Sequence, residues 1–425
     1  MRAPCALVRT WCRLTGTAPV RVLVSSRRVV ARRGSIVPIV AAALVAVLGV
    51  LALVIDRLWV DAAKVELLRA AEAAALAGAR CLADDDRLKR DADPAVIAGA
   101  AALSAVEMGR KNYVAGRPLE LDFEADVAVG AYAESESTGR SMFLTETGDP
   151  RTVIVRPALL RGRNNPVALL IRAVHGPDFA ELSVRVEASV NNLVYGVRPL
   201  LDTAVPALPL GILRKETTDQ KRPSWSSEID GKAGTDLWGY DLTTRSVVHE
   251  PDGIPEITLT LDDESGVADG ETTPASRKVN AALLKFGSES SSERLPRQLA
   301  QGLTAVDLDR TGGELTPDHR PFNTSAKFRL ASRDVKSLSA LGGEARLLLL
   351  YSERPAPGPN EQAQVRCEAL VAGRILNIEH QTGQPVRIIL QPAVVATRTA
   401  IASDEEHVVR KPNPYLYHLS LTAPR

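Results

Sequence analysis

The longest uninterrupted apolar stretch of the sequence covers residues 36–55, IVPIVAAALVAVLGVLALVI, and none of its 20 residues is charged or carries a hydroxyl group. A helix of that length, at about 1.5 Å per residue, spans roughly 30 Å, which is the hydrocarbon thickness of a bilayer. The stretch therefore predicts a transmembrane helix, and a helix buried in a protein core is the alternative. The residues expected to anchor it in lipid are Ile36, Val40, Leu44, Leu48, Leu51 and Ile55.

A helical period continues beyond the apolar stretch without a proline or a turn signal. Apolar residues recur there at intervals of three or four, so one helix is predicted from the membrane to about residue 82. A second helix is predicted at 94–110, with Asp93 as its N-cap and Pro94 at its first position. The connecting sequence, DDDRLKRDAD, indicates a solvated turn.

The spacing of apolar residues then changes from the three-to-four-residue period of a helix to the two-residue period of a strand. Apolar residues alternate with acidic ones over 119–129, and a similar alternation with polar residues covers 182–190. Together with the apolar runs at 152–156 and 167–174, these patterns predict half-buried strands. The fold class expected is α+β, with a small antiparallel sheet packed on the two preceding helices.

Three prolines at 199, 206 and 209, followed by the polar run 214–227, predict a linker over 199–227. After it, short strands are predicted at 254–261, 279–286, 344–351, 364–379 and 385–395, with short helices near 292–302 and 333–341. The expected division is a basic cytoplasmic leader (1–35), the transmembrane helix (36–55), an α+β domain (56–198), the linker, a β-rich domain (228–401) and a frayed tail (402–425).

The distribution of charge gives the apolar helix a direction. The net charge is +1, so no charge excess points to nucleic acid, but residues 1–33 hold eight arginines and no acidic residue. Arginine excess keeps one side of a span in the cytoplasm, so the N-terminus is expected inside and residues from 56 onward outside. A cleavable signal peptide is the alternative, although its apolar region is shorter. Export would permit a disulfide between Cys81 and Cys367, a pairing that the sequence leaves open.

The sequence lacks the common motifs of nucleotide, zinc and nucleophilic chemistry. The patterns GxxxxGK[ST], HExxH and GxSxG do not occur, and the six histidines have no metal-ligand spacing. No catalytic residue and no cofactor are therefore predicted. One calcium-loop candidate exists, because Asp307, Asp309, Thr311 and Asp318 fall on loop positions 1, 3, 5 and 12. An ordinary Gly-Gly turn is the alternative there.

An ordered series of residues extends from the start of the apolar stretch into the helix that follows it. Its members are Gly34, Asp56, Leu67, Ala70, Ala71, Glu72, Ala75, Leu76, Gly78 and Ala79. This series resembles the N-terminal segment of the TadE/TadG-like proteins of tight-adherence (Flp) pilus assembly. Leu68 and Glu72 depart from the Gln and Asp of the family pattern. The resemblance covers residues 34–190 well and the rest of the chain, including the C-terminal strands, loosely. The metal motif Asp-x-Ser-x-Ser of longer members is absent.

The resemblance implies a membrane-anchored component with a structural or assembly role, without catalysis, whose partners are pilus-assembly or secretion-machinery proteins. The alternatives are an envelope adhesin or structural protein without a pilus role, and a membrane-anchored exported hydrolase. Small residues let helices approach closely in lipid, which suggests homo-oligomers. The faces expected to make such contacts are Ala42, Ala46, Gly49 and Val50 in the span, and Ala71, Ala74 and Gly78 outside it. For the second face, packing on the chain's own sheet is the alternative.

Residues 32–35, Arg-Arg-Gly-Ser, also resemble the processing junction of prepilin-like proteins. Those substrates usually carry Glu at the fifth position after the cut, where this chain has Ile39. A charge inside lipid is costly and is kept for a function, such as pairing with a neighbouring subunit. Since that charge is missing, the leader is expected to remain, which would make the protein an uncleaved anchor and not a fibre subunit.

The arginine asymmetry predicts the orientation of the span. A reporter that is active only after export, fused after Gly78, should be active, and replacing the arginines between residues 21 and 33 with Glu should weaken this preference. A second reporter, active only in the cytoplasm, serves as the control at the same position. Activity of that second reporter would show that the orientation is reversed.

Overall fold

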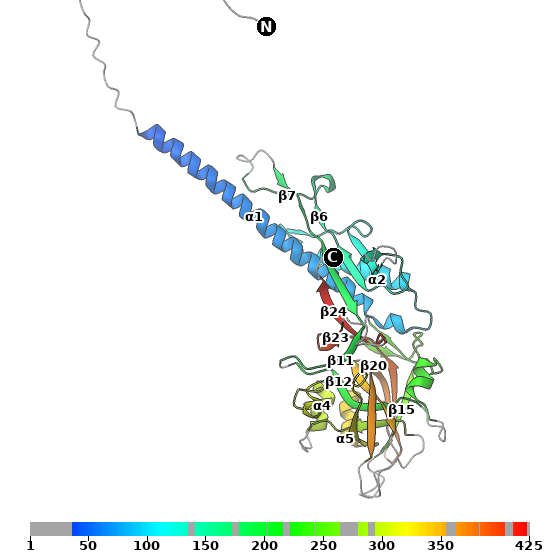
Figure 1. The fold of residues 1–425 in the computed structure, drawn as a ribbon. Coiled ribbons are helices and arrows are strands. Elements are labelled where there is room, and N and C mark those ends of the chain that lie inside the picture. The colour runs from blue at the N-terminus through cyan, green and yellow to red at the C-terminus, as the bar shows by residue number, and fades with distance from the viewer. Residues whose placement is uncertain are drawn as a thin grey trace, which may run out of the picture. The chain divides into compact units, whose positions relative to one another are not determined.

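The computed structural model describes residues 36–134, 141–171, 178–201, 203–215, 222–242, 244–263, 279–287, 294–353, 363–381, 383–403 and 411–422. These residues form an α+β protein with a long apolar N-terminal helix, a small antiparallel sheet and a β-rich C-terminal region (Figure 1), which confirms the predicted fold class. The chain divides into two units, Met1–Val54 and Ile55–Arg425.

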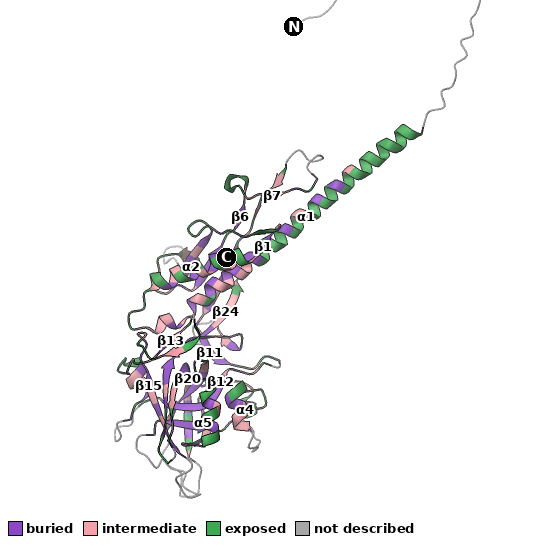
Figure 2. Cartoon of the chain, turned by 180° about the vertical axis from the view of Figure 1, so that it is seen from behind, coloured by how far each residue is buried: buried purple, intermediate pink, exposed green. Residues whose placement is uncertain are grey.

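Helix α1 runs from Val37 to Leu82, so the predicted continuous helix and its end are confirmed. The six expected anchor residues are exposed, with between 37% and 72% of their surface accessible, and Figure 2 shows the same exposure along the first turns of α1. Among the described residues, α1 is the one helix that is long and apolar enough to cross a membrane.

The C-terminal half of α1 packs with helix α2 (Pro94–Lys111) against a six-stranded sheet of order β22-β24-β10-β5-β3-β4. Asp93 caps α2 as predicted, because its carboxylate accepts the N–H of Ala95 at 2.9 Å. The strands are β3 (Val127–Glu134), β4 (Ser141–Leu144), β5 (Thr152–Val155), β10 (Val186–Asn191), β22 (Val395–Ala396) and β24 (Leu416–Thr422). Alanine and valine dominate the core between the helices and the sheet.

A larger sheet of eight strands builds the β-rich region, in the order β17-β16-β12-β19-β20-β21-β15-β18. Its strands are β12 (Ala207–Leu213), β15 (Ile257–Asp263), β16 (Ala281–Leu284), β17 (Phe322–Lys327), β18 (Arg329–Leu330), β19 (Ala345–Glu353), β20 (Gln364–Glu379) and β21 (Val386–Pro392). All five strands predicted for this region are therefore found. Helices α4 (Arg294–Gln301) and α5 (Ser332–Ser339) confirm the two predicted short helices.

The eight-stranded sheet closes on itself, because β17 pairs with β20 as well as with β16. The strands β16, β12, β19, β20 and β17 thus form a ring around an apolar core. Asn280, which is fully buried, links β15 to the start of β16. The side-chain amide of Asn280 accepts the N–H of Thr260 at 2.7 Å and donates to the carbonyl of Thr258 at 3.0 Å. These two bonds take the place of strand pairing between β15 and the start of β16.

Short pairs of strands and turns complete the fold. They are β1 (Tyr113–Val114), β2 (Arg117–Pro118), β6 (Ala158–Leu159), β7 (Val167–Ala168), β8 (Phe179–Ala180), β9 (Leu182–Ser183), β11 (Val194–Val197), β13 (Gly239–Asp241), β14 (Ser246–Val248) and β23 (Ala400–Ala402), with 3-10 turns at Asp85–Leu88, Arg161–Arg163 and Asp309–Thr311 and a π-turn at Ser226–Asp230. The strand predicted at 167–174 is reduced to β7, and residues 172–174 lie outside the described residues.

The prediction of a strand beginning at residue 119 is wrong, because β3 begins at Val127. Leu119 and Leu121 are buried as expected. However, the acidic residues between them and β3 form a turn, in which the Asp122 carboxylate accepts the N–H groups of Glu124 and Ala125. Asp and Asn side chains favour such local bonds over strand pairing.

The predicted linker over 199–227 contains a strand, so that prediction is wrong for β12. Every residue of β12 is buried, and the strand pairs with both β16 and β19. The pairing of β12 with β19 shifts its register between Ala207 and Gly211. Pro209 is tolerated there because this position needs no backbone N–H donor for strand pairing.

The prediction of a frayed C-terminal tail is also wrong. Strand β24 pairs antiparallel with β10 over five residues, with Leu419 opposite Val190. Strand β23, just before it, pairs with β11. The end of the chain therefore returns to the sheet that packs on α1 and α2, a long-range pairing that local pattern does not reveal.

The turn between α1 and α2 is not solvated as predicted, because Asp85 is buried there. Its carboxylate pairs with Arg374 of β20 at 2.8 Å and accepts the N–H of Val394 at 2.6 Å. The Arg374 guanidinium in turn stacks on the Tyr240 ring, 3.7 Å from its centre. Burial raises the pKa of Asp85, which the guanidinium opposes. This cluster joins the helical part of the second unit to the eight-stranded sheet.

Two helical glycines give opposite predictions for stability. A Cβ at Gly78 of α1 would lie 2.8 Å from the carbonyl of Ala101 and 3.1 Å from Val153, so Gly78→Ala should cost about 1–3 kcal/mol. A Cβ at Gly99 of α2 meets nothing within 4 Å, so Gly99→Ala should gain up to about 1 kcal/mol of helix propensity. Thermal unfolding of the full-length protein in detergent measures both, and a shift of the same sign in the two variants would contradict the packing described.

Candidate functional site

The second unit begins with a buried carboxylate at the end of the apolar stretch. Asp56 is 1% exposed, and its Oδ1 accepts the N–H groups of Leu170 and Ile171 at 2.8 and 3.1 Å. One turn further along α1, the indole N–H of Trp59 donates to the carbonyl of Ala168 at 3.1 Å. The Oδ2 of Asp56 has no hydrogen-bond partner in the part of the chain that the structure describes. Two side chains of α1 thus hold one loop, residues 168–171, against the helix.

The small residues of the family motif serve packing within the chain. Leu67, Ala70, Ala71, Ala75 and Ala79 are buried in the core that α1 shares with α2 and the six-stranded sheet. Glu72 and Leu76 are half-buried at its border. Gly34 lies outside the described residues.

The expectation that Ala71, Ala74 and Gly78 contact another subunit is wrong. All three are buried against the chain's own residues, and Gly78 faces Ala101, Ala105 and Val153. The glycine allows the backbone of α2 to approach α1 closely, as small residues do at helix crossings. The alternative interpretation, that this face packs on the chain's own sheet, is the one that the structure supports.

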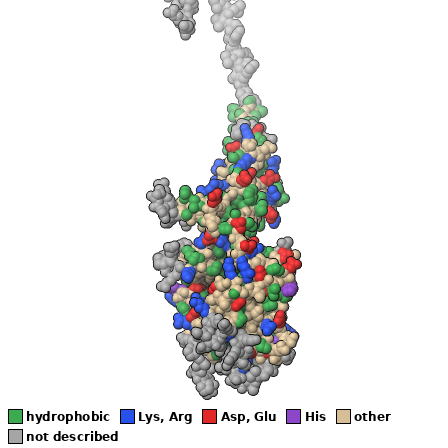
Figure 3. Space-filling model, turned by 90° about the vertical axis from the view of Figure 1, so that its right-hand side faces the viewer, with side chains coloured by type: hydrophobic (Ala, Val, Ile, Leu, Met, Phe, Trp, Pro, Cys, Tyr) green, Lys and Arg blue, Asp and Glu red, His purple; other side chains and the backbone are tan. Residues whose placement is uncertain are grey.

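A different face of α1 is exposed and apolar, and we call it the outer face. It consists of Leu58, Ala62, Val65 and Leu68, at the spacing of one helix face. Leu58 is 63% exposed, Val65 48% and Leu68 39%. Charged residues lie among them, and two of these, Arg57 and Asp61, form an exposed ion pair at 3.2 Å. Figure 3 likewise shows acidic and basic side chains interspersed over one side of the molecule, without an extended region of one charge.

The residues of the calcium-loop candidate are engaged separately. Asp307 accepts hydrogen bonds from Arg297, Gln298 and Thr304, at 2.6 to 2.9 Å. Burial alone would raise the pKa of Asp307, but these bonds hold it below its ordinary value.

The other members of the candidate have different neighbours. Asp309 accepts the N–H of Arg310, Thr311 donates to the carbonyl of Leu308, and Asp318 accepts the N–H of Leu370 in β20. The segment between them is a 3-10 turn followed by Gly312 and Gly313, both at positive φ. Within the described ranges, no three His, Cys, Asp or Glu residues are grouped as metal ligands.

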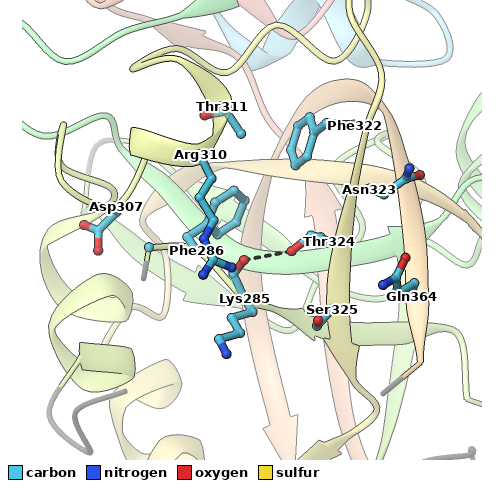
Figure 4. Close-up of a pocket in the computed structure, with 11 residues that line it drawn as sticks. Lys285, Phe286, Asp307, Arg310, Thr311, Phe322, Asn323, Thr324, Ser325 and Gln364 are labelled. Carbon is cyan, nitrogen blue, oxygen red and sulfur yellow. Dashed lines mark hydrogen bonds between the residues drawn. The ribbon is translucent and has the colours of Figure 1, made fainter. Parts of the chain in front are cut away.

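A cavity of about 220 Å³ lies where strands β16, β17 and β20 meet, beside that turn (Figure 4). Arg310 extends from the turn along Phe286, and Phe322 and Thr324 lie across from it. Asn323 and Gln364 form the far side, while the carboxylate of Asp307 points away from these residues (Figure 4). Sequence reasoning missed this cavity, because its residues come from four separate segments.

Both cysteines of the second unit are free. Cys81 is half-buried on α1, whereas Cys367 is fully buried in the core around β20. Burial raises the pKa of the Cys367 thiol to about 12. The disulfide that the sequence left open is therefore not formed, and Cys367 is a packed core residue, as its phase in the strand indicates.

Comparison with known proteins identifies one family. Residues 34–80 match the family model of Flp pilus-assembly TadE/G-like proteins. This confirms the resemblance inferred from the sequence over the apolar stretch and the C-terminal half of α1. The match ends at residue 80, so the looser likeness of later segments stays a prediction. No curated protein and no solved structure matches the chain.

The bonds of Asp56 predict a local effect of its removal. Asp56→Ala leaves two backbone N–H groups, at Leu170 and Ile171, without their charged acceptor at a partly buried site, which costs about 1–3 kcal/mol. Hydrogen exchange over residues 168–171 of the full-length protein should then be faster by roughly tenfold or more.

Asp61→Ala is the matched control, because Asp61 lies on the same helix, is half-exposed and pairs with the exposed Arg57. Exposed pairs contribute about 0–1 kcal/mol, so its exchange pattern should stay near that of the unchanged protein. Equal effects of the two substitutions would show that Asp56 does not hold the loop.

Proposed function

We propose that the protein is a membrane-anchored structural component of Flp (Tad) pilus assembly, without catalytic activity. The observation that carries the proposal is the family match at residues 34–80, which coincides with helix α1. The same helix contains the candidate membrane span and, in the second unit, most of the motif residues that pack on α2 and the sheet.

In this proposal residues 36–55 cross the cytoplasmic membrane with the N-terminus inside, and the rest of the chain is exported. The eight arginines of residues 1–33 support that orientation. Residues 56–198 together with β24 would form the domain that follows the span in the chain, and β12 together with residues 228–401 the β-rich domain. The basic leader would be retained, since no acidic residue occurs within the apolar stretch.

The outer face of α1 is the surface proposed to contact other assembly components. The apolar side chains of the buried face are already used within the chain, whereas Leu58, Val65 and Leu68 have at least 39% of their surface exposed. Burying a large apolar side chain gains about 1.5–3 kcal/mol, so a helix of a neighbouring single-pass protein would be stabilised by contact with them. Polar residues between them would restrict which partner fits.

The experiment is genetic. Deletion of the gene in the source organism should abolish Flp pili, counted by electron microscopy, and the intact gene should restore them. The double variant Leu58→Glu/Val65→Glu should reach the membrane in normal amounts but restore few or no pili, because it places charges on the outer face without touching the core.

Val96→Glu is the matched control, since Val96 is 64% exposed on α2, away from the outer face. It should restore pili as the intact gene does. Normal pili in the deletion strain would refute the assembly role, and reduced surface adhesion with normal pili would instead identify an envelope adhesin.

A further inference from the structure

The cavity beside the 309–311 turn contains a positive charge, on Arg310, that no acidic residue of the lining neutralises. Its one acidic lining residue, Asp307, is 2% exposed, and both carboxylate oxygens already accept hydrogen bonds, from Arg297, Gln298 and Thr304. Arg310 has no ion pair within the described ranges, and its side chain extends along the cavity (Figure 4). The lining is therefore net positive at the position of Arg310.

Lys285 also lines the cavity as a second cation, and the remaining lining groups are neutral, with both polar and aromatic surface. Asn323 and Gln364 each offer an amide with donor and acceptor atoms. Phe286 and Phe322 form an edge-to-face pair with ring centres 6.2 Å apart, and Phe322 is only half-buried. The hydroxyl of Thr324 is already used, since it donates to the carbonyl of Lys285 at 2.7 Å. A ligand in this cavity would thus meet two cations, Arg310 and Lys285, together with two amides and an aromatic edge.

We propose that this cavity binds a small organic carboxylate of about the size of a monosaccharide. A guanidinium presents two parallel N–H donors that match the two oxygens of a planar carboxylate. A phosphate site, in contrast, usually combines several backbone N–H donors. The volume of about 220 Å³ is below the 300–1,000 Å³ typical of drug-sized ligands, which limits the guest to a single small ring or a short chain. This site is independent of the proposed role in pilus assembly.

The position of the cavity is also typical of ligand sites. It lies where β16, β17 and β20 of the closed ring converge, and ligands often bind at the mouths of closed sheets. Gly287, three residues beyond β16, has a φ of +75° and lies beside Asp307, where a residue with a side chain would be strained. The lining residues are held by strand pairing, with Phe322 opposite Cys367 and Asn323 opposite Arg366. The cavity is therefore formed before any guest enters.

The test uses the full-length protein in detergent micelles and three probes: sodium galacturonate, galactose and inorganic phosphate. Galacturonate and galactose share a ring and differ in the carboxylate, so saturation-transfer NMR should detect galacturonate with a Kd on the order of 1 mM and no binding of galactose. Arg310→Gln should weaken galacturonate binding at least tenfold, because it removes the charged donor. Gln364→Ala should weaken it several-fold.

Arg320→Gln is the control, since Arg320 is exposed, precedes the lining residue Phe322 by two positions and does not itself line the cavity. It should bind galacturonate as the unchanged protein does. Absence of galacturonate binding at 20-fold that Kd, equal binding of galactose, equal binding of phosphate, or unchanged binding in Arg310→Gln would each overturn the proposal. Circular dichroism of Arg310→Gln checks that this variant retains the fold. If Arg310→Gln does not fold, the weaker galacturonate binding expected of Gln364→Ala provides the test instead.

Discussion

The close approach of α1 to α2 and to strand β5 is the constraint on which the helical part of the second unit depends. At Gly78 the neighbouring backbone and side chains leave no space for even a methyl group. Around it the buried face of α1 is made almost entirely of alanine, with Leu67 and Leu82 filling the wider gaps. Alanine buries little area, so stability here comes from many short contacts, which a larger residue would separate. In this chain, the alanine-rich motif is therefore explained by packing within the chain itself.

Buried carboxylates then join segments that are distant in sequence. Asp56 holds residues 170–171 against the start of the second unit, Asp126 pairs with Arg163 at 2.7 Å, and Asp85 pairs with Arg374. Each of these acids is less than a tenth exposed, and each is matched by N–H donors or a guanidinium. Breaking such a pair is costly because it leaves a buried charge without a partner. Asp56 thus fixes the loop that packs on α1, and Asp126 fixes the segment before β3 of the six-stranded sheet. Asp85 connects the turn after α1 to the eight-stranded sheet.

The sequence was sufficient for the parts of the fold that local period determines. The end of α1 at Leu82, the cap at Asp93 and the five strands of the β-rich region were predicted because apolar period and capping residues are local signals. The sequence pattern does not predict strand β12, because Pro199, Pro206 and Pro209 are typical of strand breaks, although a register shift accommodates Pro209. Strand β24 and the Asp85–Arg374 pair depend on partners some 230 to 290 residues away, which no local pattern shows. The cavity at Arg310 was missed for the same reason.

The outer face of α1 shows that hydrophobic periodicity alone does not determine which face of a helix is buried. Between residues 58 and 71 apolar residues recur at helical spacing on two faces, so the sequence identifies an amphipathic helix but not which face is inward. In the structure, the size of the side chains distinguishes the buried face from the exposed one. The face with alanine and glycine is covered by α2, which needs a close approach, and the face with leucine and valine is left exposed. Because the two faces are distinct, substitutions on the first are expected to act on folding, and substitutions on the second would act on association if the proposed function holds. The family motif and the proposed partner surface can therefore be separated by experiment, although they share one helix.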